Sequence, residues 1–238
     1  MHHPTYVCVL LVVFIIWWAA LAIAPLYRDD WLVENALTLL AAIFLASTWR
    51  SFRLSRLSYT FIFLFMCLHT LGAHYTYSEV PWDRWLQTAF GTDTHEMFGW
   101  QRNNFDRVVH FSYGLLLAYP VRELFVRVAN VQGFWGYFLP LDLTMSSSML
   151  YELIEWGAAS VLGGGLGAAY LGTQGDVWDA HKDMALASLG ALIAMTLAAS
   201  VNAHLRRDFA AEWWMSLRVK DPRPMGEDAI ARMRNTQD

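Results

Sequence analysis

Long runs of apolar residues, separated by short polar segments, dominate the hydrophobicity pattern of this chain. The runs are about 18–25 residues long, enough for an α-helix to cross a hydrocarbon layer of roughly 30 Å. They lie near Tyr6–Ala24, Trp31–Thr48, Leu57–Tyr75, Asp106–Val126, Phe134–Ala158 and His181–His204. The pattern predicts an all-α fold, a polytopic membrane bundle of about six transmembrane helices. Because the first run has no basic segment before it, we expect a retained helix and not a signal peptide.

Two shorter segments have apolar residues on one helical face. These residues are Trp82, Trp85, Leu86 and Phe90 in the first segment, and Phe209, Trp213, Trp214 and Leu217 in the second. We expect the first helix on the outer membrane surface, as an anchor or a lid, and the second on the cytoplasmic leaflet. The chain then divides into a six-helix transmembrane domain, 1–207, and a cytoplasmic tail, 208–238, that is amphipathic first and weakly ordered afterwards. The glycine-rich residues 163–167 indicate a hinge or close helix packing, because no strand precedes them as in a nucleotide site.

Composition and the distribution of arginine refine this picture. Hydrophobic residues make up 56% of the chain and charged residues 16%, which is typical of a membrane protein. Arginines gather in the connections on one side of the predicted bundle: Arg50, Arg53, Arg56, Arg122, Arg127, Arg206 and Arg207. Since cytoplasmic loops are rich in Lys and Arg, we expect both termini in the cytoplasm. The net charge of −4 argues against a nucleic-acid partner, and membrane lipids are the expected partners.

Ionisable residues cluster at the outer ends of the later apolar runs. Asp106 and His110 are four residues apart, and Glu152 and Glu155 are three apart, so each pair shares one helix face. A carboxylate beside an imidazole suits a general base or a metal ligand. Two neighbouring carboxylates repel each other unless a cation, a proton or a basic group lies between them. These four residues are therefore the candidate catalytic residues.

Further polar residues flank this set. Asp176, Asp179 and Asp183 would form one acidic stripe if they were helical. His69 and His74 are five residues apart and point about 140° away from each other on an ideal helix, so we expect at most one to face the site. The serines at 146–148 are expected to pack helices.

Three functions are compatible with this pattern. The first is a membrane-embedded hydrolase or transferase acting on a lipid-linked substrate, with a divalent metal ion as a candidate cofactor. The candidate metal ligands are His110, Glu152, Glu155, Asp176 and Asp179. The second is a transporter or a proton- or cation-coupled carrier, against which the clustering of acids at one face argues. The third is a structural or binding protein, in which the acids pair with the outer cations Arg102, Arg107 and Lys182.

Three ordered motifs carry a resemblance to a known family. They are Arg102–Phe111, Tyr151–Trp156 and Leu171–Met184, and they are similar to those of the YjdF-like family of bacterial inner-membrane proteins. The resemblance spans the chain from about the second apolar run to the sixth. It implies a multi-pass protein of the inner membrane and adds no activity to the three candidates. More remotely, the order of the polar residues resembles that of VanZ-like membrane proteins, and likeness at that level does not establish function.

Overall fold

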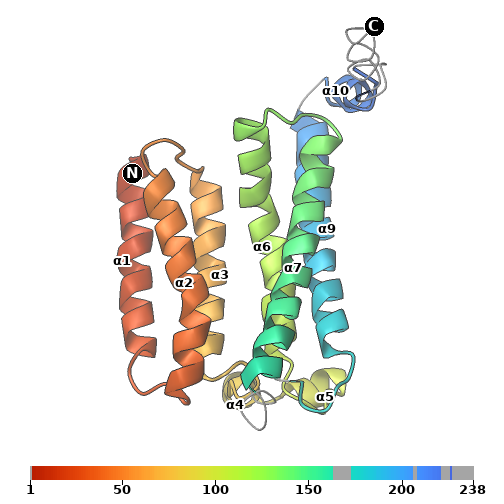
Figure 1. Cartoon of the computed structure of the whole chain (residues 1–238). Helices are drawn as coiled ribbons and strands as arrows, with labels where there is room; N and C mark the ends of the chain where they lie inside the picture. The colour runs from red at the N-terminus through yellow and green to blue at the C-terminus, as the bar shows by residue number, and fades with distance from the viewer. Residues whose placement is uncertain (1, 163–172, 206–207, 221–225, 227–238) are drawn as a thin grey trace, which may run out of the picture.

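The computed structural model describes residues 2–162, 173–205, 208–220 and 226, and this part of the chain contains helices and loops but no strand. Long helices run side by side as a bundle (Figure 1). They are α1 (His3–Leu21), α2 (Arg28–Thr48), α3 (Arg56–His74), α6 (Phe105–Val128), α7 (Trp135–Leu162) and α9 (Asp179–Leu205). The all-α membrane bundle predicted from the apolar runs is confirmed. α1 begins three residues before the predicted range, because Pro4 fits the first turn of a helix, where its missing N–H is not needed.

Four of these helices, α1, α2, α3 and α9, are long and apolar enough to cross a membrane. α6 and α7 are 24 and 28 residues long and lie beside the other four, although they carry more polar residues. Successive long helices alternate in direction, so α1 begins at the same end of the bundle at which α9 finishes (Figure 1). That this end faces the cytoplasm, and that all six long helices span the membrane, stay predictions.

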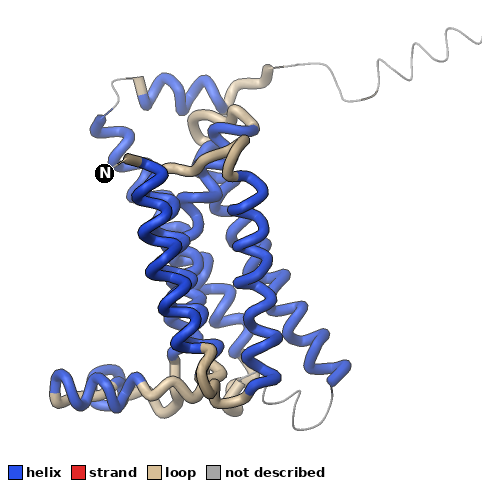
Figure 2. The backbone as a smooth tube through the Cα atoms, turned by 90° about the vertical axis from the view of Figure 1, so that its left-hand side faces the viewer, coloured by secondary structure: helices blue, strands red, loops and turns tan. Residues whose placement is uncertain are grey.

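Two short helices, α4 (Trp82–Phe90) and α5 (Thr94–Phe98), lie at the opposite end of the bundle. Helical segments at this end lie across the direction of the long helices (Figure 2). The side chain of Asp83 in α4 accepts hydrogen bonds from the backbone N–H and the hydroxyl of Thr94, at 3.0 and 2.7 Å, which ties α4 to α5. Trp82 packs edge-on against Phe105 at the start of α6. The helix predicted around Trp82 is confirmed, and it is anchored to the end of α6 that carries the polar residues.

α6 packs most extensively against α9, and two glycines allow their backbones to approach closely. A Cβ on Gly114 would overlap the carbonyl oxygen of Ala187, and a Cβ on Gly190 would overlap that of Phe111. Small residues at such positions are typical of tightly packed membrane helices. This contact fixes the start of α6 beside the start of α9, where Asp106 and Asp183 lie.

The predicted amphipathic helix of the tail is present as α10 (Phe209–Ser216), which lies against the start of α7. The backbone N–H groups of Gly133 and Phe134 donate to the side chains of Glu212 and Ser216, at 3.2 and 2.9 Å. Trp213 packs against the Phe134 ring with the centroids 5.3 Å apart. The weakly ordered end predicted for the tail falls on 221–225 and 227–238, and the hinge or close packing predicted for residues 163–167 falls within 163–172; these ranges lie outside the described residues.

Candidate functional site

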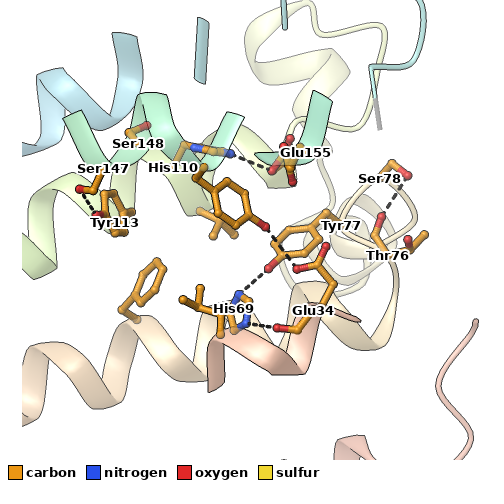
Figure 3. A pocket seen from close by; sticks show the side chains of 15 residues that line it. Glu34, His69, Thr76, Tyr77, Ser78, His110, Tyr113, Ser147, Ser148 and Glu155 are labelled. Atoms are coloured by element: carbon orange, nitrogen blue, oxygen red, sulfur yellow. Dashed lines mark hydrogen bonds and ion pairs between the residues drawn. The ribbon is translucent and has the colours of Figure 1, made fainter. Parts of the chain in front are cut away.

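A cavity of about 210 Å³ lies among α2, α3, α6 and α7, near the end of the bundle that carries α4 and α5. Its acidic and histidine lining residues are Glu34, His69, Asp106, His110 and Glu155, and Tyr77, Tyr113 and Tyr151 line it as well. Figure 3 shows His110 and Glu155 on one side of the cavity and Glu34 and His69 on the other. Ionisable groups at such positions in a membrane bundle usually have a functional or pairing reason to be there. We therefore take this cavity as the candidate functional site.

His110 is the centre of the site. Its Nε2 lies 3.4 Å from Oδ1 of Asp106, one turn earlier on α6, and 3.4 Å from Oε1 of Glu152 on α7. The side chains of His110 and Glu152 are both about nine-tenths buried. The shared helix face of Asp106 and His110 is confirmed, and α7 supplies the second carboxylate. The imidazole is thus held between two carboxylates in a poorly solvated place, where electrostatic interactions are strong.

Asp183 on α9 completes this cluster. Asp106, His110 and Asp183 each offer one possible ligand atom, and these atoms all lie within 4.8 Å of one another. Asp183 is only 2% exposed, and its Oδ1 has no hydrogen-bond partner among the described residues. The sequence alone places Asp183 on one stripe with Asp176 and Asp179, near a helix N-terminus where an acid is favourable, and it predicts no ligand role for this residue.

The opposite wall of the cavity carries a carboxylate that sequence reasoning missed. Glu34 on α2 is buried, and its carboxylate accepts a long hydrogen bond of 3.4 Å from the hydroxyl of Tyr151 on α7. The available signal was a single acidic residue, the fourth of the apolar run Trp31–Thr48. Glu155 also lines the cavity, one turn after Glu152 on α7. The site therefore combines carboxylates from α2, α6, α7 and α9.

The two histidines of α3 have different surroundings. His69 Nε2 lies 3.1 Å from the backbone carbonyl of Glu34, and His69 Nδ1 lies 2.5 Å from the hydroxyl of Tyr77. Because a carbonyl oxygen can only accept, Nε2 carries the proton, and Nδ1 of the neutral ring accepts from Tyr77. His74 instead donates to the carbonyl of Leu21, at 2.7 Å. As expected from their spacing, only His69 lines the cavity.

Asp176 and Asp179 belong to a different network, made of ion pairs. Arg102 binds both carboxylate oxygens of Asp179, at 2.6 and 3.1 Å, and Arg107 binds Asp176 at 2.5 Å and Asp179 at 3.1 Å. Lys182 also binds Asp176, at 2.6 Å. The hydrogen bonds from Lys182 and from the backbone N–H of Trp178, together with Arg107, lower the pKa of Asp176 to about 2.

The network separates the predicted metal ligands into two groups. His110 lies beside Glu152, and it lines the cavity together with Glu155. Asp176 and Asp179, in contrast, are neutralised by Arg102 and Arg107. This is the pairing that a structural role predicts for these two residues. It ties the segment before α6 to the segment before α9 and so supports the end of the bundle that contains the cavity.

Polar residues near the opposite end of the bundle serve helix packing. The carboxylate of Glu123 accepts from the backbone N–H of Ser55, at 2.9 Å, and from the hydroxyl of Ser58, at 2.6 Å, where α3 begins. It also binds Arg127, one turn later on α6. Arg122 lies over the ring of Tyr137, 4.5 Å from its centroid. These contacts join α3, α6 and α7.

Serine residues on α7 also differ in their surroundings. The hydroxyl of Ser147 hydrogen-bonds to that of Tyr113, at 2.6 Å, and so joins α7 to α6. Ser148 was expected to pack helices, yet it also lines the cavity, and its Oγ has no hydrogen-bond partner among the described residues.

Comparisons with known proteins agree with this architecture. Residues 6–204 match a family described as "Predicted membrane protein (DUF2238)". The inner membrane protein YjdF of Escherichia coli (strain K12) is 37% identical to this chain over 180 residues, which cover 75% of this chain and 82% of that protein. No solved structure matches the chain significantly. The remote similarity to VanZ-like proteins is not shown by these comparisons. The chain is a multi-pass inner-membrane protein, and the match over most of its length shows that it belongs to the DUF2238 family of membrane proteins.

Proposed function

We propose that this chain is a membrane-embedded hydrolase or transferase that acts on the polar group of a lipid-linked substrate. One observation carries the proposal: a buried imidazole lies between two carboxylates beside a cavity that further carboxylates line. A protein that needed only helix pairing would neutralise its buried acids, as Arg102 and Arg107 neutralise Asp176 and Asp179. No described arginine or lysine forms an ion pair with Asp106, Glu152 or Asp183.

The cavity provides groups that can transfer protons. Hydrolysis and group transfer both need a base to accept a proton from the attacking nucleophile and an acid to protonate the leaving group. Glu155 and Glu34 line opposite walls of the cavity, so a substrate between them would have a carboxyl group on each side. We assign these proton transfers to Glu155 and Glu34, and we assign the charged centre of the site to Asp106, His110 and Glu152.

The size and position of the cavity support a lipid-linked substrate. Pockets that hold drug-sized molecules are typically about 300–1,000 Å³, so a cavity of about 210 Å³ accommodates a small polar group and not a whole lipid. Trp82, the first residue of α4, stacks on Trp100, and tryptophan is enriched at the membrane–water interface. A substrate would thus place its headgroup in the cavity and keep its apolar part among the helices or in the bilayer.

The contacts of Glu123 favour an enzyme over a carrier. A carrier needs polar groups that continue from the cavity towards the other side of the membrane. In the described part of the chain, Glu123 caps the start of α3 and binds Arg127. Its carboxylate therefore holds helices together and does not extend a polar path from the cavity.

The test is lipid turnover by purified protein in nanodiscs made from a bacterial polar lipid extract, followed by mass spectrometry. We expect one lipid class to be consumed, and we expect Glu155→Gln to slow this by about 10²-fold or more, as loss of a general acid or base does. The matched control is Asp142→Asn, because Asp142 is an exposed carboxylate near the other end of the same helix. Consumption that is equal in wild type and Glu155→Gln, or no consumption by the wild type, would contradict the proposal.

A further inference from the structure

We infer that Asp106, His110 and Asp183 form a binding site for a divalent metal ion. The inference deepens the proposed function, on which it rests for the role of the ion, and it keeps only His110 of the five ligands expected from the sequence. Asp183, from α9, takes the place of Asp176 and Asp179, which the arginines occupy.

The geometry of the three side chains suits a single ion. One oxygen or nitrogen from each lies within 4.8 Å of the others. Zinc bound at about 2.0–2.2 Å by nitrogen and oxygen ligands keeps those ligands roughly 3–4 Å apart. Small movements of the side chains would therefore close the three ligands around one ion. The residues come from α6 and α9, and the Gly114 and Gly190 contact fixes the relative position of these helices.

A buried carboxylate oxygen without a hydrogen bond supports a cation site. Asp183 is 2% exposed, and its Oδ1 has no hydrogen bond within the described residues. Oε1 of Glu152 also lacks a hydrogen bond there, although it lies 3.4 Å from Nε2 of His110. A buried ionised group without a partner is strongly unfavourable, so buried charges are normally paired or bound to metal. A metal ion held by Asp106, His110 and Asp183 would give the Asp183 carboxylate a partner, and its positive charge would offset the nearby charge of Glu152.

The charge balance of the cluster leads to the same conclusion. Three carboxylates, those of Asp106, Asp183 and Glu152, surround one imidazole, which can supply at most one positive charge. Arg102 and Arg107, which lie beside the cluster in sequence, bind Asp176 and Asp179. A divalent cation would bring the cluster close to neutrality.

The ligand set limits the identity of the ion. Two carboxylates and one imidazole are hard and borderline ligands, which suit Mg²⁺, Mn²⁺ or Zn²⁺ and not a thiophilic metal such as Cu⁺. His110 and Asp106 also line the cavity, so an ion bound to them would lie at its wall. There it would polarise a substrate oxygen or lower the pKa of a bound water, which is the chemistry that hydrolysis or transfer requires.

The test measures metal binding directly. The full-length protein is stripped with a chelator, equilibrated separately with Mg²⁺, Mn²⁺ and Zn²⁺, and assayed for bound metal and for melting temperature. We expect at least one of the three ions to bind at about one per chain, and Asp183→Asn and His110→Gln to weaken that binding by about tenfold or more. Asp176→Asn and Asp142→Asn should retain the ion, because the first lies in the ion-pair network and the second is far from the site along α7.

A second measurement needs no variant. In wild-type protein loaded with Mn²⁺, pulsed electron paramagnetic resonance should detect the nitrogen of a coordinated imidazole. The inference is overturned if none of the three ions binds the wild type, if Asp183→Asn and His110→Gln bind as well as wild type, or if loaded Mn²⁺ shows no imidazole nitrogen. Metal binding without lipid turnover would overturn only the proposed function. Equal turnover in stripped and loaded protein would overturn the catalytic role of the ion and leave the proposed function in place.

Discussion

At the scale of single residues, the buried acidic side chains have two different kinds of surroundings. Asp179 is bound through both oxygens by Arg102, whereas Asp183, one turn further along α9, has an oxygen without a hydrogen bond in the described structure. Both are almost fully buried. Retaining an uncompensated buried carboxylate is costly unless something else binds it. The contrast between these two aspartates is the main reason to regard the His110 cluster as a site and the arginine network as support.

The substitution Asp183→Asn tests this contrast through stability. In metal-free protein, replacing this buried carboxylate, whose Oδ1 has no hydrogen bond among the described residues, should raise the free energy of unfolding by about 1 kcal/mol or more. With Mn²⁺ at about one hundred times its dissociation constant, the wild type should gain about 2.7 kcal/mol that the variant lacks. The effect of the substitution should therefore change sign between the two conditions, as measured by thermal unfolding in detergent. The same effect with and without metal would argue that Asp183 binds no ion.

At the scale of elements, the contact between α6 and α9 positions the site. Gly114 and Gly190 let the two backbones meet, and this fixes which side chains at the starts of the helices face each other. The ion pairs of Arg102 and Arg107 then tie down the segment that enters α9. The glycine contact and the ion pairs together define the rotation of α9, because either one alone would leave that rotation less well defined.

The substitution Gly114→Ala should destabilise the bundle, because its Cβ would overlap the backbone carbonyl of Ala187, which cannot move independently of α9. Overpacking of this kind typically costs about 1–3 kcal/mol. The matched control is Gly157→Ala on α7, where an added Cβ meets nothing within 4 Å and better helix propensity should make the change neutral or favourable. Thermal unfolding of both variants measures the difference. Equal melting temperatures for the two would show that α6 and α9 do not pack as described.

The contribution of the Asp176 ion pairs to the free energy of unfolding should depend on pH. The pKa of Asp176 is lowered to about 2 in the folded protein, mainly by its hydrogen bond with Lys182. A lowered folded-state pKa stabilises the protein above the unfolded value of about 3.9, and this contribution is lost as the pH falls towards 2. The difference in stability between wild type and Asp176→Asn should therefore be constant above about pH 5 and shrink below pH 4. A difference that changes between pH 6 and 8 would contradict the assigned pairing.

At the scale of the whole molecule, local patterns predicted the helices, and distances between helices could not be predicted. Each long apolar run corresponds to a helix, and the spacing of Asp106 and His110 was enough to place them on one face. Glu34 was missed because nothing local to α2 shows that it approaches Tyr151, 117 residues later. The pairing of Arg102 with Asp179 likewise joins residues 77 positions apart. Such contacts depend on how the helices rotate against one another, which hydrophobic periodicity does not specify when a helix is apolar on most sides.

The arginine distribution makes a prediction about the whole chain in its membrane. Since the Arg-rich connections should lie in the cytoplasm, a fluorescent protein fused after residue 238 should fluoresce, and alkaline phosphatase fused there should be inactive. Fusions within the connection between α4 and α5 should behave in the opposite way. Active phosphatase at the C-terminal position would reverse the orientation and place the cavity on the cytoplasmic side.

The most direct measurement of the central claim, that the buried cluster around His110 is a working site, is anomalous diffraction from crystals equilibrated separately with Mn²⁺ and with Zn²⁺. We predict an anomalous peak for at least one of the two ions in contact with Asp106, His110 and Asp183, at the wall of the cavity that Glu155 and Glu34 line. Crystals with no peak there for either ion, or with the only peak beside Asp176 and Asp179, would contradict the account.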